Sequence, residues 1–486
     1  MQVIQPIPKE EWDVVVVGAG VAGLAAAVSA LDLGAKTLVL EKAPNLKNTN
    51  TYRAGGFVMF ERGIEARTSM SLTAPVEEKI EEAIKASEGK CDPQVIRLLW
   101  ENMDGSMSWL TQHGFAWWGE GTGKATVTIP TGRALQSMGA GAGFNNQLRE
   151  ITEEMGGKIV FGVKVKGLLL NAKGRVVGVR TLTPEGLIDY GARGGVVLAT
   201  SGFQGNQEML IKYMGANIAY GFRLTGSPYS TGEGHLMAQQ VGAKLSFMDQ
   251  FETRTVDKTW RPGSPGQVGP IRALGGIYFS CVFVNKLGKR FMDESLASHD
   301  EIAGSIVVQP DSVATFVFDE NVRMIAPDEV ARYERTRPGI IIRADTIEEL
   351  ATKIATPPGQ LRQTIDEYNK AIDNGTAASL DVPKSGYQVK IETPPFCAVY
   401  PVWCGLNATV GGPLVNSKAL VLDQEGDPIP GLYAAGEMVG GSFYAKYITT
   451  PGGAIYRKSA VEYVPWGIAM GVILGRIAGA NAGTLE

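Results

Sequence analysis

The sequence predicts an α/β fold built on a parallel sheet, and its N-terminal segment carries this prediction. An apolar run at Asp13–Val17, DVVVV, is suited to a strand that is buried on both faces of a parallel sheet. A glycine-rich turn follows directly, and an alanine-rich helix is expected over Leu24–Leu33. A second apolar strand, Lys36–Leu40, ends at the acid Glu41. Strand, turn, helix and strand in this order form a βαβ unit.

The turn between the first strand and the helix has the spacing GxGxxG, with glycines at Gly18, Gly20 and Gly23. The first glycine permits a tight turn, the second lets backbone N–H groups approach a diphosphate, and the third lets helix and strand pack closely. The helix N-terminus presents partial positive charge to the phosphates, and Glu41 is placed to bind ribose hydroxyls. The pattern predicts a Rossmann-like dinucleotide site, but it does not separate NAD from FAD.

Later segments favour FAD. Asn48–Phe57, NTNTYRAGGF, has two glycines able to pack against a flat ring, and Lys158–Thr181 has the pattern of two strands. Gly195–Gly202, GVVLATSG, is typical of a buried strand that enters a small-residue turn, and Gly431–Gly436, GLYAAG, is followed by Glu437. Each segment alone is better explained as a core strand with a loop. Together, in this order after a dinucleotide turn, they indicate a flavoprotein.

Over nearly the whole chain these residues resemble the fumarate reductase and succinate dehydrogenase flavoprotein family. Phe283–Glu294, FVNKLGKRFMDE, is similar to the family's VNxxGxRFxNE stretch, which lies in a mobile capping domain. Met438–Tyr444 and the closing GRIAG at Gly475–Gly479 most resemble the tricarballylate dehydrogenase branch. The flavin 3-ketosteroid dehydrogenases are a related branch.

The resemblance implies a Rossmann-like FAD-binding domain, a parallel sheet with helices, interrupted by an inserted α+β capping domain. The FAD-binding parts are expected over 1–240 and 390–486, and the capping domain over 241–389. Within the insert, apolar residues at helical spacing predict helices over Thr346–Ile354 and Pro358–Asn374.

The residues expected to bind FAD come from the turn, from the later segments and from the start of the last helix. They are Gly18, Gly20, Ala22, Gly23, Glu41, Lys42, Asn50, Thr51, Gly55, Gly56, Val163, Ala199, Thr200, Gly202, Gly436, Glu437, Gly467 and Ile468. The last helix is expected over Trp466–Ala478, and its N–H groups would stabilise negative charge on the reduced flavin. Relatives attach FAD covalently through a histidine in the loop that corresponds to Asn48–Phe57. This loop has none, so FAD is expected to be non-covalent.

The family resemblance implies hydride transfer between flavin N5 and a carbon, with a proton exchanged at the neighbouring carbon. The product is a C=C bond beside a carbonyl or carboxylate, or the reverse reaction gives its reduction. His299 stands where fumarate-type relatives have a proton-donating arginine, and Asn407–Gly412, NATVGG, replaces HHTMGG, whose histidine grips a substrate carboxylate. Both departures favour a small organic acid or a cyclic, steroid-like enone over fumarate itself.

Three residues are candidates for catalysis. Tyr463, just before the last helix, lies near a position where steroid-type relatives use tyrosine to polarise a ketone or take the proton. His299 is able to move protons near neutral pH. Arg457, with Lys446 as the alternative, lies in the loop where the family has its final arginine. Tyr463 is equally suited to packing the cap, and His299 to an ordinary loop position.

Composition and motifs limit the other possibilities. A net charge of −4 argues against nucleic-acid binding, and three histidines without HxH or HExxH argue against a metal site. The apolar stretch Val464–Ala482 contains Pro465 and Arg476, which favours a buried helix over an integral membrane segment. Four cysteines without CxxC spacing, after a start that lacks a signal-peptide pattern, predict reduced thiols in a cytoplasmic protein.

Alternatives to the dehydrogenase or reductase interpretation stay open at this point. One alternative is a flavoprotein oxidase of an alcohol or amine. Another is a flavin electron-transfer subunit of a larger complex, against which the cap-like insert and the absence of an expected membrane anchor argue. An NAD-only dehydrogenase would leave the GLYAAGE segment, Gly431–Glu437, without a role. No CxxCH haem motif is present, so the electron donor or acceptor is expected to be a separate partner alongside a small-molecule substrate.

Overall fold

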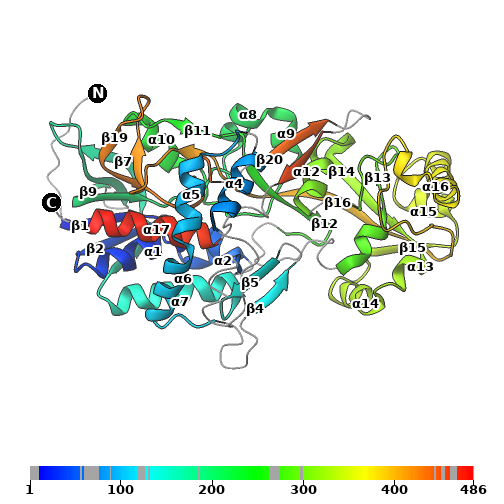
Figure 1. Ribbon diagram of the computed structural model, residues 1–486, viewed down its shortest axis with the longest axis horizontal. Coiled ribbons are helices and arrows are strands. Elements are labelled where there is room, and N and C mark those ends of the chain that lie inside the picture. The colour runs from blue at the N-terminus through cyan, green and yellow to red at the C-terminus, as the bar shows by residue number, and fades with distance from the viewer. Residues whose placement is uncertain are drawn as a thin grey trace.

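The computed structural model describes residues 10–54, 57–59, 76–87, 89–117, 126–129, 132–183, 186–261, 274–295, 299–442, 445–449, 455–459 and 468–484. The described elements form two lobes (Figure 1). N-terminal and C-terminal elements lie together in one lobe, and elements from the middle of the chain form the other. Two strands, β12 (Phe251–Asp257) and β16 (Phe396–Thr409), run between the lobes.

The first lobe contains an eight-stranded sheet whose main path is β18-β19-β9-β1-β2-β6, with β7 and β8 continuing from β9. Strands β19, β9, β1, β2 and β6 pair in parallel, which confirms the predicted α/β class. β1 is buried over its last six residues, as its continuous apolar run predicts. The strands are β1 (Glu10–Val17), β2 (Thr37–Glu41), β6 (Lys158–Phe161), β7 (Lys164–Leu170), β8 (Val176–Thr183), β9 (Gly186–Leu198), β18 (Leu420–Leu422) and β19 (Pro428–Ala434).

Two helices from opposite ends of the chain pack together on this sheet. α1 (Val21–Leu31) and α17 (Ile468–Gly483) lie side by side in Figure 1. A Cβ on Gly475 would lie 2.2 Å from the Ala22 carbonyl oxygen, and a Cβ on Gly479 would lie 2.0 Å from the Ala26 carbonyl oxygen. The glycines therefore allow backbone-to-backbone contact between the helices. No helix within the described ranges has the length and apolar character needed to cross a bilayer.

The second lobe contains a six-stranded sheet centred on β16. Its other strands are β10 (Arg223–Leu224), β12, β13 (Val282–Asn285), β14 (Val313–Phe318) and β15 (Ile341–Ala344). Helices α12 (His299–Val307), α13 (Glu320–Arg323), α14 (Pro327–Thr336), α15 (Ile347–Lys353) and α16 (Pro358–Asp373) surround it. β10 and β16 come from outside 241–389, the range expected for the capping domain, so this sheet extends past the expected bounds. The domain boundaries therefore stay predictions.

The two predicted helices of the insert agree with α15 and α16, and their starts follow from local chemistry. The Thr346 side chain accepts a hydrogen bond from the Glu349 N–H and caps α15. Pro358 occupies the first turn of α16, where its missing N–H is not needed.

Three local expectations were wrong. Lys158–Thr181 holds β6, β7 and the start of β8 rather than two strands, because Gly162 has φ +74° and breaks the first run. The first helix begins at Val21 instead of Leu24, directly after the glycine turn, and the last one continues to Gly483.

Further elements lie around the two sheets. They are η1 (Leu46–Asn48), α2 (Asn50–Arg53), β3 (Phe57–Met59), α4 (Val76–Ser87), α5 (Pro93–Glu101), α6 (Met103–Gln112), β4 (Thr126–Ile129), β5 (Gly132–Gln136), α7 (Ala140–Glu154), α8 (Gln207–Met214), α9 (Ala216–Gly221), α10 (Glu233–Gln240), β11 (Leu245–Ser246), η2 (Gly275–Ser280), η3 (Pro310–Ser312), η4 (Ala377–Ser379), β17 (Gly412–Pro413), η5 (Gly436–Met438), β20 (Ala445–Thr449) and β21 (Ile455–Ser459).

Candidate functional site

The turn between β1 and α1 is closed by direct backbone contact. Gly18 has φ +110°, and a Cβ on it would lie 2.3 Å from the Ala199 carbonyl oxygen. A Cβ on Gly23 would lie 1.9 Å from the Gly18 carbonyl oxygen. α1 has no side-chain cap from Gly20 and no acidic residue in its first turn. Its N-terminus therefore fits an anionic ligand such as the diphosphate of a dinucleotide.

Glu41 ends β2 beside this turn. Its Oε2 accepts a hydrogen bond from the Ala19 N–H at 2.8 Å, and its Oε1 accepts one from the Ala43 N–H at 2.7 Å. Burial raises the pKa of Glu41, although both backbone hydrogen bonds act to lower it. Each carboxylate oxygen has a second acceptor position, so the side chain fits a pair of ribose hydroxyls. The Val163 N–H donates to the Glu41 carbonyl oxygen at 3.0 Å and holds the next loop in place.

The short helix α2 joins the turn to a second carboxylate. Thr51 Oγ1 accepts a hydrogen bond from the Val21 N–H at 3.0 Å. Asn50 Nδ2 lies 2.8 and 3.0 Å from the two oxygens of Glu437, and Ser201 Oγ donates to Glu437 at 2.6 Å. Burial raises the pKa of Glu437, offset in part by these neutral donors. Asn50 and Glu437, which were predicted from two distant segments, thus meet in one hydrogen-bonded cluster with Ser201, which was not among the predicted residues.

Lys42, another predicted cofactor residue, contacts an acidic side chain at the start of α10. Its Nζ donates to Glu233 at 2.8 Å and to Thr231 Oγ1 at 2.5 Å, and Lys164 also pairs with Glu233 at 2.9 Å. Burial lowers the pKa of Lys42. The hydrogen bonds from these partners outweigh burial and lower the pKa of Glu233 to about 2. The Lys42 ammonium is therefore engaged within the protein.

The remaining predicted FAD residues that the structure describes act through close packing. A Cβ on Gly202 would lie 2.2 Å from Thr409 Oγ1. Gly436 has φ +77°, and a Cβ on it would lie 2.8 Å from the Cβ of Ala22. Thr200 follows the end of β9, so Thr200 and Gly436 lie at the carboxyl ends of neighbouring parallel strands. Ligands of open α/β sheets bind at this edge.

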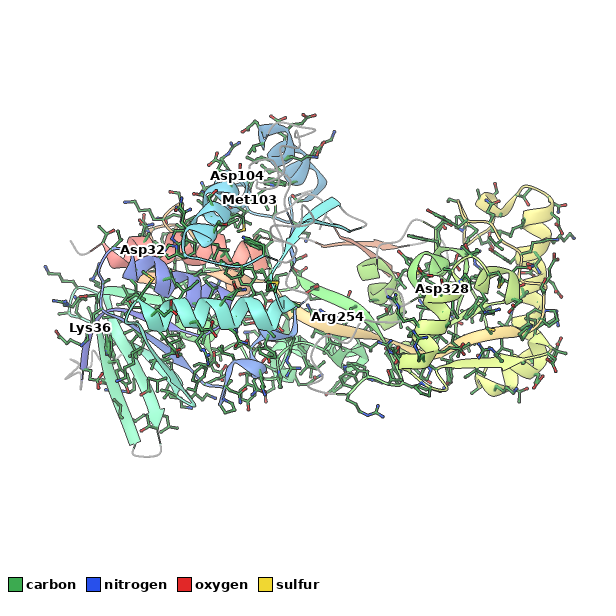
Figure 2. The ribbon with its side chains drawn as sticks, turned by 90° about the horizontal axis from the view of Figure 1, so that it is seen from below. Asp32, Lys36, Met103, Asp104, Arg254 and Asp328 are labelled. Carbon is green, nitrogen blue, oxygen red and sulfur yellow. The ribbon has the colours of Figure 1, made fainter. Side chains whose placement is uncertain are left out.

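A charged network lies beside the cofactor residues, on the strands that join the lobes. Asn407 Nδ2 donates to Glu252 Oε2, and Arg254 Nη2 donates to Asn407 Oδ1. Figure 2 shows Arg254 between the lobes, with Asp328 far into the second lobe. A Cβ on Gly226 would lie 2.0 Å from the Asn407 carbonyl oxygen and 3.1 Å from Asn50 Oδ1. One glycine therefore separates this network from the cofactor cluster.

Sequence reasoning identified Asn407 but missed Glu252 and Arg254. A signal was available, because residues two apart in a strand share a face. Glu252 and Arg254 are such a pair in β12, which is otherwise mostly buried. Their pairing with Asn407 follows from the antiparallel alignment of β12 with β16, which the sequence did not reveal.

His235 is a further residue that sequence reasoning missed. It lies in α10 with its side chain fully buried, and its Nε2 donates to the Gly411 carbonyl oxygen at 2.8 Å. Burial lowers the pKa of His235 to about 4, so the imidazole is neutral at physiological pH. A Cβ on Gly412 would lie 3.0 Å from the His235 ring. His235 therefore fixes the end of the NATVGG segment.

Four predicted residues lie outside the described residues: Gly55, Gly56, Tyr463 and Gly467. His299 begins α12 and Arg457 lies in β21, but neither side chain belongs to the described set. Ile468 begins α17 and is buried. Within the described ranges, no three His, Cys, Asp or Glu side chains are grouped to hold a metal ion.

A family model described as "FAD binding domain" matches residues 13–447 of the chain. The NADH:acrylate oxidoreductase of Vibrio harveyi is 29% identical over 499 residues, which cover 89% of this chain and 48% of that relative. The chain thus spans about half the length of this relative.

Two solved structures share the fold. A flavocytochrome c3 fumarate reductase in an open conformation has a TM-score of 0.75 and 28% identity, and the match covers 98% of this chain and 79% of that one. The 3-ketosteroid-Δ4-(5α)-dehydrogenase of Rhodococcus jostii RHA1, in complex with 4-androstene-3,17-dione, has a TM-score of 0.73 and 25% identity, with 98% of both chains covered.

Proposed function

Since the chain belongs to the FAD binding domain family, we propose that it is an FAD-dependent oxidoreductase. It forms or reduces a C=C bond beside a carbonyl or carboxylate. The observation that carries this proposal is the position of the Glu252–Asn407–Arg254 network, one glycine away from the Asn50–Glu437 cluster. FAD, when bound, supplies a hydride acceptor or donor at N5.

The cofactor residues have distinct tasks in this proposal. The uncapped N-terminus of α1 binds the diphosphate, and Glu41 accepts hydrogen bonds from ribose hydroxyls. Glu437, oriented by Asn50 and Ser201, meets the cofactor at the carboxyl edge of the sheet. FAD is held non-covalently, since the described part of the α2 loop, 48–54, contains no histidine.

The contacts of Asn407 favour a substrate other than a simple dicarboxylate. Both ends of its amide are bound within the protein, to Glu252 and Arg254, where a dicarboxylate would need additional cations. The acidic Glu252 balances the charge of Arg254. A substrate with a single carbonyl or carboxylate beside its double bond suits this balance, as in a small organic acid or a cyclic, steroid-like enone. Acrylate and the ketosteroid named for the two relatives are of these classes.

Proton transfer in this proposal is assigned to Tyr463 or His299, with Arg457 as a cation for the developing oxyanion. The position of His299 at the start of α12 supports its part, because α12 packs against β12 and β16, the strands that carry the Glu252–Asn407–Arg254 network. The electron donor or acceptor is a separate partner.

The test is anaerobic reoxidation of the photoreduced enzyme, followed by the visible flavin absorbance. The panel contains acrylate, cyclohexenone, 4-androstene-3,17-dione and fumarate. We expect reoxidation by at least one of the first three compounds to be faster than by fumarate. Arg254→Met should slow it, whereas Arg362→Met, on the outer helix α16, serves as the matched control. Fast reoxidation by oxygen alone, with release of peroxide, would favour an alcohol or amine oxidase instead.

We also propose that the protein works in the cytoplasm. Support comes from its cysteines, Cys91, Cys281, Cys397 and Cys404, which are all free and buried. Cell fractionation with an antibody against the chain tests this proposal, and recovery from the periplasm would overturn it.

A further inference from the structure

Arg53, the last residue of α2, is a buried cation without a counter-ion among the residues that the structure describes. Its exposed fraction is 5%, and its Nε and Nη1 have no hydrogen-bond partner among the described residues. Burial alone lowers the pKa of Arg53, with no contribution from a described carboxylate. An unpaired buried charge is among the most unfavourable arrangements in a protein, and a guanidinium cannot escape it by losing its proton.

A second buried arginine shows how this chain satisfies a guanidinium that has a purely structural role. Arg290 pairs with Glu294 at 2.7 Å and donates to the carbonyl oxygens of Val382 at 2.6 Å and Pro383 at 2.8 Å. Arg53 has no equivalent set of acceptors. The missing acceptors of Arg53 therefore point to a ligand.

Arg53 belongs to the short helix whose other residues contact the candidate cofactor site. Asn50 lies three residues earlier in α2, and residues with this spacing are neighbours on one face of a helix. Asn50 orients Glu437, and Thr51 binds the first N–H of α1. The Arg53 guanidinium is thus carried by the same helical turn that contacts both the predicted diphosphate site and the Glu437 cluster.

We propose that Arg53 binds an oxyanion of a ligand at this site, either a phosphate of FAD or the carboxylate of the substrate. This inference rests on the proposed function. Both oxyanions present two oxygens in the geometry that a guanidinium recognises through parallel hydrogen bonds. Binding satisfies the donors that the protein leaves free, and it orders α2 against the N-terminus of α1.

The experiment compares the wild type with Arg53→Met, which keeps the length of the side chain and removes its charge. Affinities of the apoprotein for FAD and ADP are measured by calorimetry, and the affinity of the holoenzyme for propionate is measured by flavin difference spectra. We expect one class of oxyanion to bind about 10- to 100-fold more weakly to the variant. If Arg53→Met loses affinity for FAD and ADP, Arg53 binds a phosphate of the cofactor. If it loses affinity for propionate alone, Arg53 binds the carboxylate of the substrate.

Thermal unfolding of the apoprotein distinguishes ligand binding from a structural role, because the loss of a structural arginine would lower the melting temperature. Removing an unpaired buried charge should leave the apoprotein melting temperature unchanged or higher, while the gain on adding the oxyanion shrinks. Arg476→Met is the matched control, since Arg476 donates to Ser106 and lies over the Trp109 ring. It should lower the apoprotein melting temperature and leave all three affinities unchanged.

Arg53→Lys keeps the charge but lacks the planar fork, so it should restore part of the lost affinity, and it serves if Arg53→Met does not fold. Unchanged affinities for FAD, ADP and propionate in the folded variants would overturn the inference while leaving the proposed function intact. A wild-type apoprotein that binds neither FAD nor ADP would instead contradict the proposed function itself.

Discussion

Two glutamates, one in each lobe, show how the chain treats a buried carboxylate in two ways. Glu294 in the second lobe is fully buried and surrounded by cations. It lies 2.7 Å from Arg290 and 3.3 Å from Lys384, and it accepts the Phe283 N–H at 2.9 Å. Burial acts to raise the pKa of Glu294, but the two cations outweigh burial and lower it.

Glu437 in the first lobe is part-buried and has only neutral donors, Asn50 and Ser201, as its described partners. Its pKa is raised by burial, because the hydrogen bonds only partly offset the loss of water. Removing one partner of a carboxylate enclosed by cations is expected to destabilise its lobe. We propose that Glu437, held by neutral donors at the sheet edge, is instead the carboxylate that responds to a ligand.

The largest expected effect comes from Glu294→Gln. The substitution leaves Arg290 and Lys384 as buried cations without a carboxylate, which costs about 3–5 kcal/mol of unfolding free energy. Urea denaturation of the apoprotein measures it. Glu348→Gln, which removes an exposed pair with Arg362, should change stability little. Equal losses of unfolding free energy in the two variants would show that the buried Glu294 contributes no more to stability than an exposed ion pair.

A smaller effect is expected where the first lobe depends on close contact instead of charge. Gly479→Ala places a Cβ 2.0 Å from the Ala26 carbonyl oxygen and should destabilise by about 1–3 kcal/mol, with weaker FAD binding. Gly359→Ala, in α16, has open space and should stabilise by about 0.5–1 kcal/mol. Thermal unfolding with and without FAD distinguishes them. If Gly479→Ala leaves the unfolding free energy and FAD binding unchanged, α1 and α17 do not need direct backbone contact.

The smallest effect is a difference in pH dependence. The folded state raises the pKa of Glu437, so wild-type apoprotein loses stability relative to Glu437→Gln as pH rises above the unfolded value of about 4.3. For Glu294 the sign is reversed, because a lowered pKa gives stability that is present above the unfolded value and is lost as pH falls. Urea midpoints between about pH 2 and pH 8 measure both, since the loss for Glu294 lies below the unfolded pKa. Parallel pH profiles for the two variants would contradict the comparison.

Local sequence patterns were sufficient for the first lobe's parallel sheet and for the glycine turn and Glu41 at its edge. Glu437 came from the family resemblance, and its position beside Asn50 fits a parallel sheet, whose strands bring their carboxyl ends to one edge. Helices α15 and α16 were predictable from apolar spacing and their first residues. Each of these features depends on neighbours in the sequence or on one repeated unit.

Features that depend on pairing between distant segments were not predictable. Lys384 falls in a stretch with few large apolar residues, which predicts a connector, yet it is fully buried against Glu294. His235 has no motif around it, and its role depends on where Gly411 lies. Arg254 required the alignment of β12 with β16. A charged residue in a sequence does not reveal its partner, so burial of such a residue requires the fold.

The most direct test of the account is acid precipitation of the purified holoprotein, followed by absorbance of the supernatant and the pellet. The glycine turn, Glu41 and Glu437 are proposed to hold FAD without a covalent bond. The account therefore predicts that the supernatant contains FAD in a ratio of about one per chain and that the pellet is colourless. Flavin that stays in the pellet, or a protein purified without flavin that does not take up FAD, would contradict it.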